Sequence, residues 1–348
     1  MQILSTIFWA VLVLGFLIFI HEFGHFIFAR IFKVKINEFS LGMGPRLVWY
    51  DSKKTGIRYS LAMFPLGGFV AMEGESDESD DPNSFDKKPA WQRLIISLAG
   101  PITNIFIGFA AMVILTVFID VGGTTVNRFY DRNEGIVSSE SAGLMSGDTI
   151  LSVNGRGVKY LDDLSYEIMR SGNEPCDLLV LRDGEKTEIK NVIFPTATES
   201  GQVFGVRDFS VNIVEKNPLF FIDYSVRKTF LLVKMCVESL FDLITGRFSV
   251  EAVSGPVGIS EAIGEAARTD ILNLVYLAGF ISVNLGIMNL LPIPALDGGR
   301  SLVLIAEIIT KKRIPPKIEN TINAVALILL LGLSVLVMFK DIFTIIGR

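Results

Sequence analysis

The stretch that decides the fold runs from Ile3 to Phe32 and reads ILSTIFWAVLVLGFLIFIHEFGHFIFARIF. Its first charged residue is Glu22. A helix that crosses a bilayer needs roughly 20 consecutive apolar residues, so this segment predicts a transmembrane helix. No basic region precedes it and no small-residue cleavage site follows it, so we do not expect a cleavable signal peptide.

Three more apolar stretches follow the first one. We expect transmembrane helices over residues 1–32, 94–119, 271–310 and 320–346, each long enough to span. Half of the 348 residues are hydrophobic and 20% are charged, against roughly 25% charged residues in soluble domains. The sequence therefore predicts a polytopic α-helical membrane protein with about four transmembrane helices.

The charge balance and the cysteines exclude other classes of protein. The net charge of −5 offers no basic surface for nucleic acid. Cys176 and Cys236 cannot build a disulfide framework or a CxxC metal site.

Lysine and arginine residues near the span ends predict the orientation. They gather between the first two spans, in residues 33–93, and between the last two, in residues 311–317. The N-terminus carries none, and the C-terminal tail carries only Lys340 and Arg348. We therefore expect these two loops in the cytoplasm, both termini outside, and residues 120–271 as one extracytoplasmic region.

The extracytoplasmic region contains a small α+β domain. Turn signals and alternating patterns predict strands over residues 134–138, 149–153, 178–182 and 186–193, and residues 161–170 have helical spacing. Asn154-Gly155 is a hairpin turn signal. Residues 217–270 follow, apolar but interrupted by charges, which fits an amphipathic helix at the membrane interface and a helix packed on the domain equally well.

The cytoplasmic segment 33–93 has two parts. Phe39–Met72 contains strand-like, glycine-containing pieces that are apolar enough to enter the membrane boundary, where irregular backbone survives only against protein or a water-filled cavity. We expect a membrane-associated β-loop here. In Glu73–Asp86 seven of fourteen residues are acidic, which predicts a solvated, flexible loop.

The only two histidines of the chain stand in the sequence His21-Glu22-Phe23-Gly24-His25, an HExxH motif. Residues i and i+4 of a helix share a face, so both imidazoles can reach one metal ion. Glu22 points about 100° away around the helix axis, close enough to reach water at that ion. Ionisable groups inside a membrane helix are costly and mark functional sites, so we expect a metal site.

A catalytic zinc site uses three protein ligands and keeps a fourth position open. With no further histidine, the third ligand should be a carboxylate, and Asp297 and Glu307 are the main candidates in the apolar spans. Asp297 follows two prolines and precedes two glycines, which should break the helix at a depth similar to that of the histidines. Glu307 is nearer the basic loop 311–317 that follows the span, where we expect it to pair with Lys311 or Lys312.

The joint pattern resembles the site-2 protease family of intramembrane zinc metalloproteases, in particular bacterial members that carry a PDZ domain and regulate envelope stress responses. The resemblance covers nearly the whole chain, and the region 124–208 resembles a bacterial PDZ domain. Some relatives have two such domains where this chain has one. The resemblance to the family rests on the following segments: HExxH at 21–25, FSLGMGP at 39–45, FPLGGFVAM at 64–72, AGPITN at 99–104, SAGLMSGDTILSVNG at 141–155 and NLLPIPALDGG at 289–299.

The resemblance implies roles for individual residues. His21, His25 and Asp297 would hold one Zn²⁺ per chain, and Glu22 would be the catalytic glutamate. Asn289 and Pro292, with Gly67 and Gly68 of the β-loop, would bind the unwound substrate strand.

The resemblance also implies a biological setting. The substrates would be single-span membrane proteins, such as anti-sigma-factor-like regulators or remnant signal peptides, cut in regulated intramembrane proteolysis. The lipid bilayer of the bacterial cytoplasmic (inner) membrane would surround the chain. The PDZ-like domain would bind peptide ends or gate access to the site.

Two other functions stay open from the sequence. A membrane zinc carrier would also place histidine and aspartate in its spans, but it would not need Glu22 as a base. A catalytically inactive PDZ scaffold would not need the full set of ligands and the glutamate.

Overall fold

A computed structural model of the chain describes residues 2–75, 77–130, 139–199, 202–247, 254–313 and 315–346. The strand expected over 134–138 lies outside these described residues. The chain forms two compact units. Unit 1 comprises Met1–Met112, Leu232–Leu240 and Val253–Arg348, and unit 2 comprises Val113–Leu231 and Phe241–Ala252.

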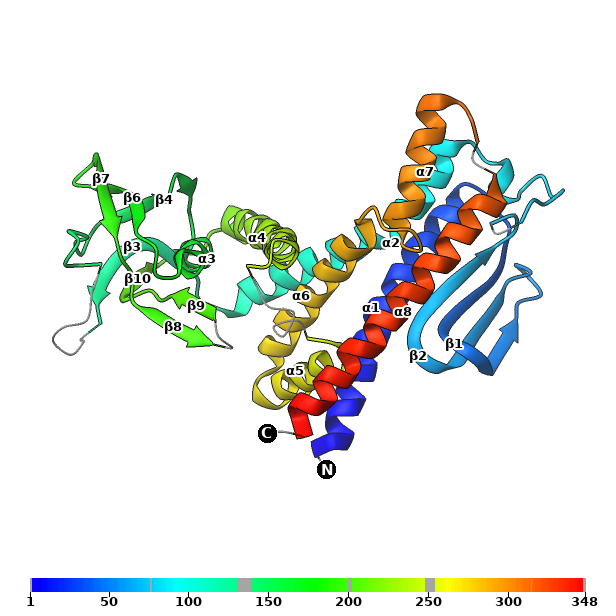
Figure 1. Cartoon of the computed structure of the whole chain (residues 1–348), viewed down its shortest axis with the longest axis horizontal. Helices are drawn as coiled ribbons and strands as arrows, with labels where there is room; N and C mark the ends of the chain where they lie inside the picture. The colour runs from blue at the N-terminus through cyan, green and yellow to red at the C-terminus, as the bar shows by residue number, and fades with distance from the viewer. Residues whose placement is uncertain are drawn as a thin grey trace. The chain divides into compact units, whose positions relative to one another are not determined.

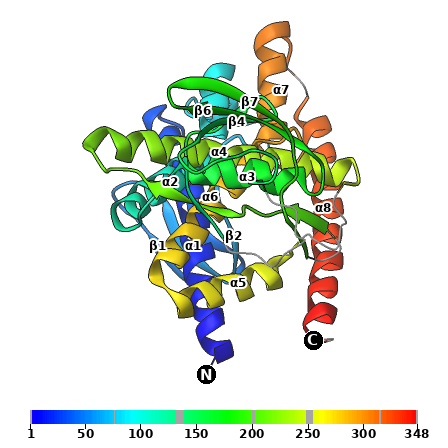
Figure 2. The same ribbon diagram turned by 90° about the vertical axis from the view of Figure 1, so that its left-hand side faces the viewer.

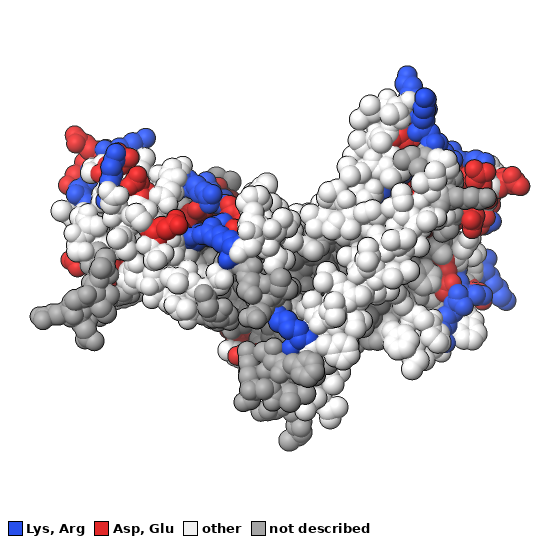
Figure 3. Space-filling model, in the orientation of Figure 1, with Lys and Arg blue, Asp and Glu red and all other residues white. Residues whose placement is uncertain are grey.

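Unit 1 contains the apolar helices. Among the described residues, four helices are long and apolar enough to cross a membrane, over Ile3–Ile31, Ala90–Phe118, Ile271–Leu290 and Ile318–Asp341, which agrees with the expected number; the third ends at Leu290 and not at residue 310. In unit 1, α1 begins and α8 ends at the same end (Figures 1 and 2), as an even number of spans requires. An uncharged surface runs along α8 (Figure 3). Unit 1 contains α1 (Gln2–Ile31), η1 (Phe85–Lys87), most of α2 (Ala90–Phe118, of which Val113–Phe118 belong to unit 2), α5 (Pro256–Thr269), α6 (Ile271–Leu290), α7 (Asp297–Thr310) and α8 (Pro316–Ile346).

The expected break in the third span is confirmed. Helix α6 ends at Leu290, and α7 begins at Asp297. Pro292 and Pro294 lie between them, and a proline has no N–H with which to continue a helix. A Cβ atom on Gly298 would lie 2.2 Å from the carbonyl oxygen of Leu291, so only glycine lets the loop fold back onto the start of α7.

Small residues bring the helices of unit 1 close together. A Cβ atom on Gly24 of α1 would lie 2.6 Å from the carbonyl oxygen of Ala99 in α2. A Cβ atom on Gly286 of α6 would lie 2.7 Å from the carbonyl oxygen of Pro101, also in α2. Close backbone approach of this kind is how membrane helices gain packing contacts. Helix α2 is therefore held between α1 and α6.

The expected β-loop is a curled antiparallel hairpin of β1 (Ile36–Asp51) and β2 (Arg58–Met72) beside α1 (Figure 1). Its association with the membrane stays a prediction. Its register is unusual because Phe39 lies beside both Val70 and Tyr59. The segment 38–41 therefore has a strand neighbour on each side. Segment 68–72 has one strand neighbour in the described part of the chain, so its other edge carries no ladder.

Unit 2 is built around an antiparallel sheet in the order β10-β3-β4-β6-β7, with β5 paired to β4. Val126, Ile150, Leu164 and Val180 are among its buried core residues. The expected strands and helix over 149–193 are present, and Asn154 (φ 50°) and Gly155 (φ 75°) form the predicted turn. The elements are β3 (Gly122–Phe129), β4 (Thr149–Val153), β5 (Arg156–Gly157), α3 (Leu161–Ser171), β6 (Cys176–Arg182), β7 (Glu185–Val192), β8 (Thr196–Glu199), β9 (Gln202–Gly205) and β10 (Phe209–Ile213).

The sheet extends beyond the predicted end of the small domain at residue 208. Strand β10 pairs with β3, so Phe209 lies opposite Phe129. Residues 209–213 therefore belong to the same sheet.

Helix α4 (Pro218–Ile244) shows why both interpretations of segment 217–270 fitted its sequence. Its charged residues bind α3: Lys228 pairs with Asp162 at 2.5 Å, and Arg227 with Asp163 at 3.3 Å. These ion pairs support packing on the small domain. Its opposite side exposes apolar residues such as Phe230 (69% exposed), which keeps the interfacial prediction open.

Two expectations about charged residues are wrong. Glu307 pairs with Arg93 at 2.5 Å rather than with Lys311 or Lys312, because α7 packs against the start of α2. The acidic run Glu73–Asp86 is not a uniformly solvated loop. Asp86 is 6% exposed, and Asp81 binds Lys35 at 2.9 Å, because the segment folds back onto the start of β1.

Candidate metal centre

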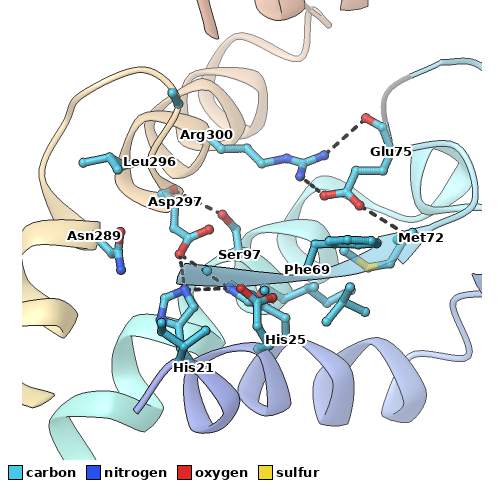
Figure 4. Close-up of a pocket in the computed structure, with 18 of the residues that line it drawn as sticks. His21, His25, Phe69, Met72, Glu75, Ser97, Asn289, Leu296, Asp297 and Arg300 are labelled. Atoms are coloured by element: carbon cyan, nitrogen blue, oxygen red, sulfur yellow. Dashed lines mark hydrogen bonds and ion pairs between the residues drawn. The ribbon is translucent and has the colours of Figure 1, made fainter. Parts of the chain in front are cut away.

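The two histidines and the candidate third ligand come together as expected. His21 and His25 lie one turn apart on α1, and Asp297 is the first residue of α7. The three possible ligand atoms form a nearly equilateral triangle. His21 Nε2 lies 3.1 Å from Asp297 Oδ2, His25 Nε2 lies 3.4 Å from the same oxygen, and the two nitrogens are 3.3 Å apart. Figure 4 shows the carboxylate pointing toward both imidazoles.

This triangle fits zinc. Zinc binds imidazole nitrogen at about 2.0–2.1 Å in tetrahedral sites, so neighbouring ligand atoms should lie about 3.3 Å apart. The three measured separations surround this value. Two imidazoles and one carboxylate are also a ligand set used by catalytic zinc sites, which keep the fourth position for water or substrate. Among the described residues, His21, His25 and Asp297 form the one cluster of three or more histidine, cysteine or acidic side chains that is close enough together to hold a metal ion.

Helix α2 supports the imidazoles. His25 Nδ1 is hydrogen-bonded to the carbonyl oxygen of Ile96 at 2.7 Å, which leaves its Nε2 facing Asp297. A Cβ atom on Gly100 would lie 2.3 Å from His25 Nε2 and 2.9 Å from His21 Cε1. The missing side chain of Gly100 therefore makes room for both rings.

Helix α2 also supports Asp297. The hydroxyl of Ser97 donates a hydrogen bond to the main-chain carbonyl of Asp297 at 3.2 Å. The carboxylate stands at the N-terminus of a 14-residue helix, where a negative charge is favoured by the helix dipole. The break before α7 thus turns the third candidate ligand toward α1.

A cavity of about 550 Å³ contains the triad. Glu22 lines it, and a Cβ atom on Gly68 of β2 would lie 2.9 Å from Glu22 Cγ. Within the described residues, the Glu22 carboxylate takes no hydrogen bond or ion pair, and Glu22 faces the cavity. Gly67, Gly68 and Asn289 also line the cavity, whereas Pro292 lies in the helix break and is not among the lining residues.

Sequence reasoning missed an ion pair in the wall of this cavity. The Arg300 guanidinium binds the Glu75 carboxylate (Figure 4). It also lies 4.5 Å from the centre of the Phe85 ring. Glu75 comes from the acidic run, whose charge density favoured a solvated loop. The signal that could have found the pair is the position of Arg300, one helical turn after Asp297 on the same face.

Comparisons with known proteins agree with this geometry. The family model of Peptidase family M50 matches residues 9–333. A Clostridium perfringens protein named as a zinc metalloprotease is 34% identical over 97% of this chain and 98% of its own. A similarly named Clostridium acetobutylicum protein is 33% identical over 96% of both chains. Zinc metalloprotease RasP of Bacillus licheniformis is 27% identical over 97% of this chain and 99% of its own. The chain therefore belongs to peptidase family M50 and is a zinc metalloprotease of the site-2 protease type.

Proposed function

We propose that this chain is an intramembrane endopeptidase that cleaves transmembrane segments of single-span membrane proteins. The observation that carries the proposal is the position of the triad. His21 and His25 lie within the candidate span Ile3–Ile31, and Asp297 meets them from the helix break that follows the span Ile271–Leu290. A peptide bond that reaches this centre must therefore come from within or beside the membrane.

His21, His25 and Asp297 are the proposed ligands, and Glu22 is the proposed general base. A zinc ion held there would supply Lewis acidity, lowering the pKa of water and polarising the scissile carbonyl. Glu22 takes the proton of the attacking water and passes it to the leaving amide nitrogen. Its lack of a partner among the described residues leaves the carboxylate able to do this.

The strand edge at residues 68–72 is the proposed place for the substrate. A helical transmembrane segment protects its amides by its own hydrogen bonds, so it must unwind before it is cut. An unwound strand can pair with an open sheet edge. Gly67 and Gly68 line the cavity at this edge, and Asn289 lines it from α6, so we assign all three to substrate binding. Pro292 is assigned a supporting role, because it shapes the break that brings Asp297 to the site.

The surrounding parts suggest how substrates are selected. The antiparallel sheet and α3 of unit 2 are compatible with a PDZ-like domain, which would bind peptide ends or exclude bulky substrates. The distribution of basic residues supports an orientation with unit 2 and both termini outside the bacterial cytoplasmic membrane. Cleavage would then release cytoplasmic fragments. Anti-sigma-factor-like regulators and remnant signal peptides are the proposed substrates, and regulated intramembrane proteolysis is the proposed setting.

The test is cleavage of a single-span substrate in detergent or liposomes by the purified full chain. Glu22→Gln should reduce cleavage to background while zinc stays near one ion per chain, because the ligands are intact. Asp297→Asn should lose zinc, because a neutral amide is a poor replacement for the carboxylate. Glu307→Gln is the matched control, since Glu307 binds Arg93 rather than the triad, and it should keep its zinc.

The same assay separates an enzyme from a zinc carrier. A carrier would lose little by Glu22→Gln. Normal cleavage by this variant, or zinc content that follows Glu307 instead of Asp297, would contradict the proposal.

A further inference from the structure

Asn104 carries a buried side-chain amide beside the metal centre, and it is neither one of the proposed zinc ligands nor the proposed base. It lies in α2, is 0% exposed, and its main-chain carbonyl accepts a hydrogen bond from Ser282 of α6 at 2.7 Å. An unpaired amide in the apolar interior of a membrane protein costs free energy, so its side chain should have a partner. Among the described residues, that partner is His21, whose Nδ1 lies 3.4 Å from Asn104 Nδ2, while Asn104 Oδ1 has no partner.

The chemistry of a zinc ligand decides what His21 needs from this neighbour. His21 Nε2 faces Asp297 at 3.1 Å and is its ligand atom. A ligating nitrogen must be unprotonated, so the ring proton is on Nδ1. Nδ1–H opposite an amide NH₂ would place two donors against each other.

A half-turn of the Asn104 amide removes this conflict. The oxygen and nitrogen of an amide have nearly the same shape, and the hydrogen-bond network decides which is which. After the half-turn, Oδ1 lies opposite His21 Nδ1–H and accepts its proton. The oxygen that has no partner thereby gains one.

We propose that Asn104 is a positioning residue of the zinc centre: its side-chain oxygen accepts the Nδ1 proton of His21 and holds Nε2 toward the metal. His25 is held in the same way, because its Nδ1 is bonded to the carbonyl oxygen of Ile96 at 2.7 Å. Residues 96 and 104 lie eight apart on one face of α2, and Gly100 between them leaves room for the rings. One face of α2 thus fixes the tautomers of both ligating histidines. The inference depends on the zinc centre and not on which substrate is cut.

The test is zinc affinity, measured by chelator competition on the purified full chain. Asn104→Leu keeps the volume but removes the acceptor. It should weaken zinc binding by about 10–100-fold, as loss of such a partner does elsewhere. Asn104→Asp keeps an acceptor and should stay within about threefold of the wild type. With cobalt in place of zinc, the visible spectrum of the Leu variant should change and that of the Asp variant should not.

Asn284→Leu is the matched control. Asn284 is also an amide in a membrane helix, but it donates to the carbonyl of Phe280 at 3.0 Å and does not line the cavity. This variant should bind zinc as the wild type does. It reports the cost of the substitution without the contact to His21.

Two outcomes overturn the inference. One is wild-type zinc affinity in Asn104→Leu. The other is zinc binding in Asn104→Asp as weak as that expected for the Leu variant, because the amide would then act as a donor to His21. This second outcome overturns the inference even if the Leu variant does not fold. If the zinc results are as expected but the wild type cuts no membrane substrate, the proposed function fails and the role of Asn104 stands.

Discussion

Gly100→Ala should damage the zinc centre without unfolding the protein. The added Cβ atom would lie 2.3 Å from His25 Nε2, whereas ordinary contact begins near 3.4 Å. His25 would have to move by about 1 Å, while zinc–ligand distances hold to within about 0.2 Å. The His25 ring cannot rotate away easily, because its Nδ1 is bonded to the carbonyl oxygen of Ile96, which lies in α2 like Gly100. One ligand is therefore lost or misplaced.

We expect zinc affinity to fall by at least about 100-fold, which corresponds to about 2.7 kcal/mol. Cleavage of a transmembrane substrate should fall to background. Stability should change less, because alanine gains about 1 kcal/mol of helix propensity over glycine. That gain offsets part of the roughly 1–3 kcal/mol that overpacking costs. The measurements are zinc content by elemental analysis, chelator competition, cleavage, and thermal unfolding in detergent.

Gly15→Ala is the control. Gly15 lies in the apolar part of α1, and a Cβ atom there would meet nothing within 4 Å. This variant should keep both zinc and activity. If Gly100→Ala keeps zinc affinity within about threefold of the wild type, α2 does not press on the imidazoles as described, and the reasoning fails.

Three further predictions concern other parts of the chain. Gly68→Ala should slow cleavage without releasing zinc, because its Cβ would lie 2.9 Å from the side chain of Glu22, the proposed base; loss of zinc with the activity would contradict this reason. In intact cells, an impermeant thiol reagent should label Lys190→Cys and miss Glu78→Cys, since both positions are exposed and are expected on opposite sides of the membrane; the reverse labelling would overturn the orientation. Burial favours a higher pKa for Asp148, but two bonds from Arg182 at 2.7 Å and one from the main-chain N–H of Met145 at 2.8 Å together outweigh it and hold the pKa below its ordinary value near 4. The stability that this ionised carboxylate contributes is present above pH 4 and is lost as the pH falls through the folded-state pKa. The thermal unfolding temperature should therefore change less between pH 5 and pH 3 in Asp148→Asn than in the wild type.

The sequence alone determined the local parts of this protein. Apolar runs of about 20 residues can satisfy their backbone groups in a bilayer only as helices, so the four spans followed from length and composition. HExxH placed His21 and His25 on one helix face because i and i+4 are neighbours on any helix. Prolines and glycines around Asp297 marked the break, since proline cannot continue the hydrogen-bond ladder.

Only the tertiary structure decided which distant groups meet. Nothing local to Glu307 distinguishes Arg93 from Lys311 as its partner, because that choice depends on how α7 packs against α2. The same packing gives Glu75 of the acidic run its place beside Arg300. Asn104 shows the limit most clearly. Its amide is one polar residue in an uncharged span until α2 and α1 pack together and set it 3.4 Å from His21. Side-chain contacts between helices depend on rotation and depth, and a helix's own sequence period leaves both undetermined.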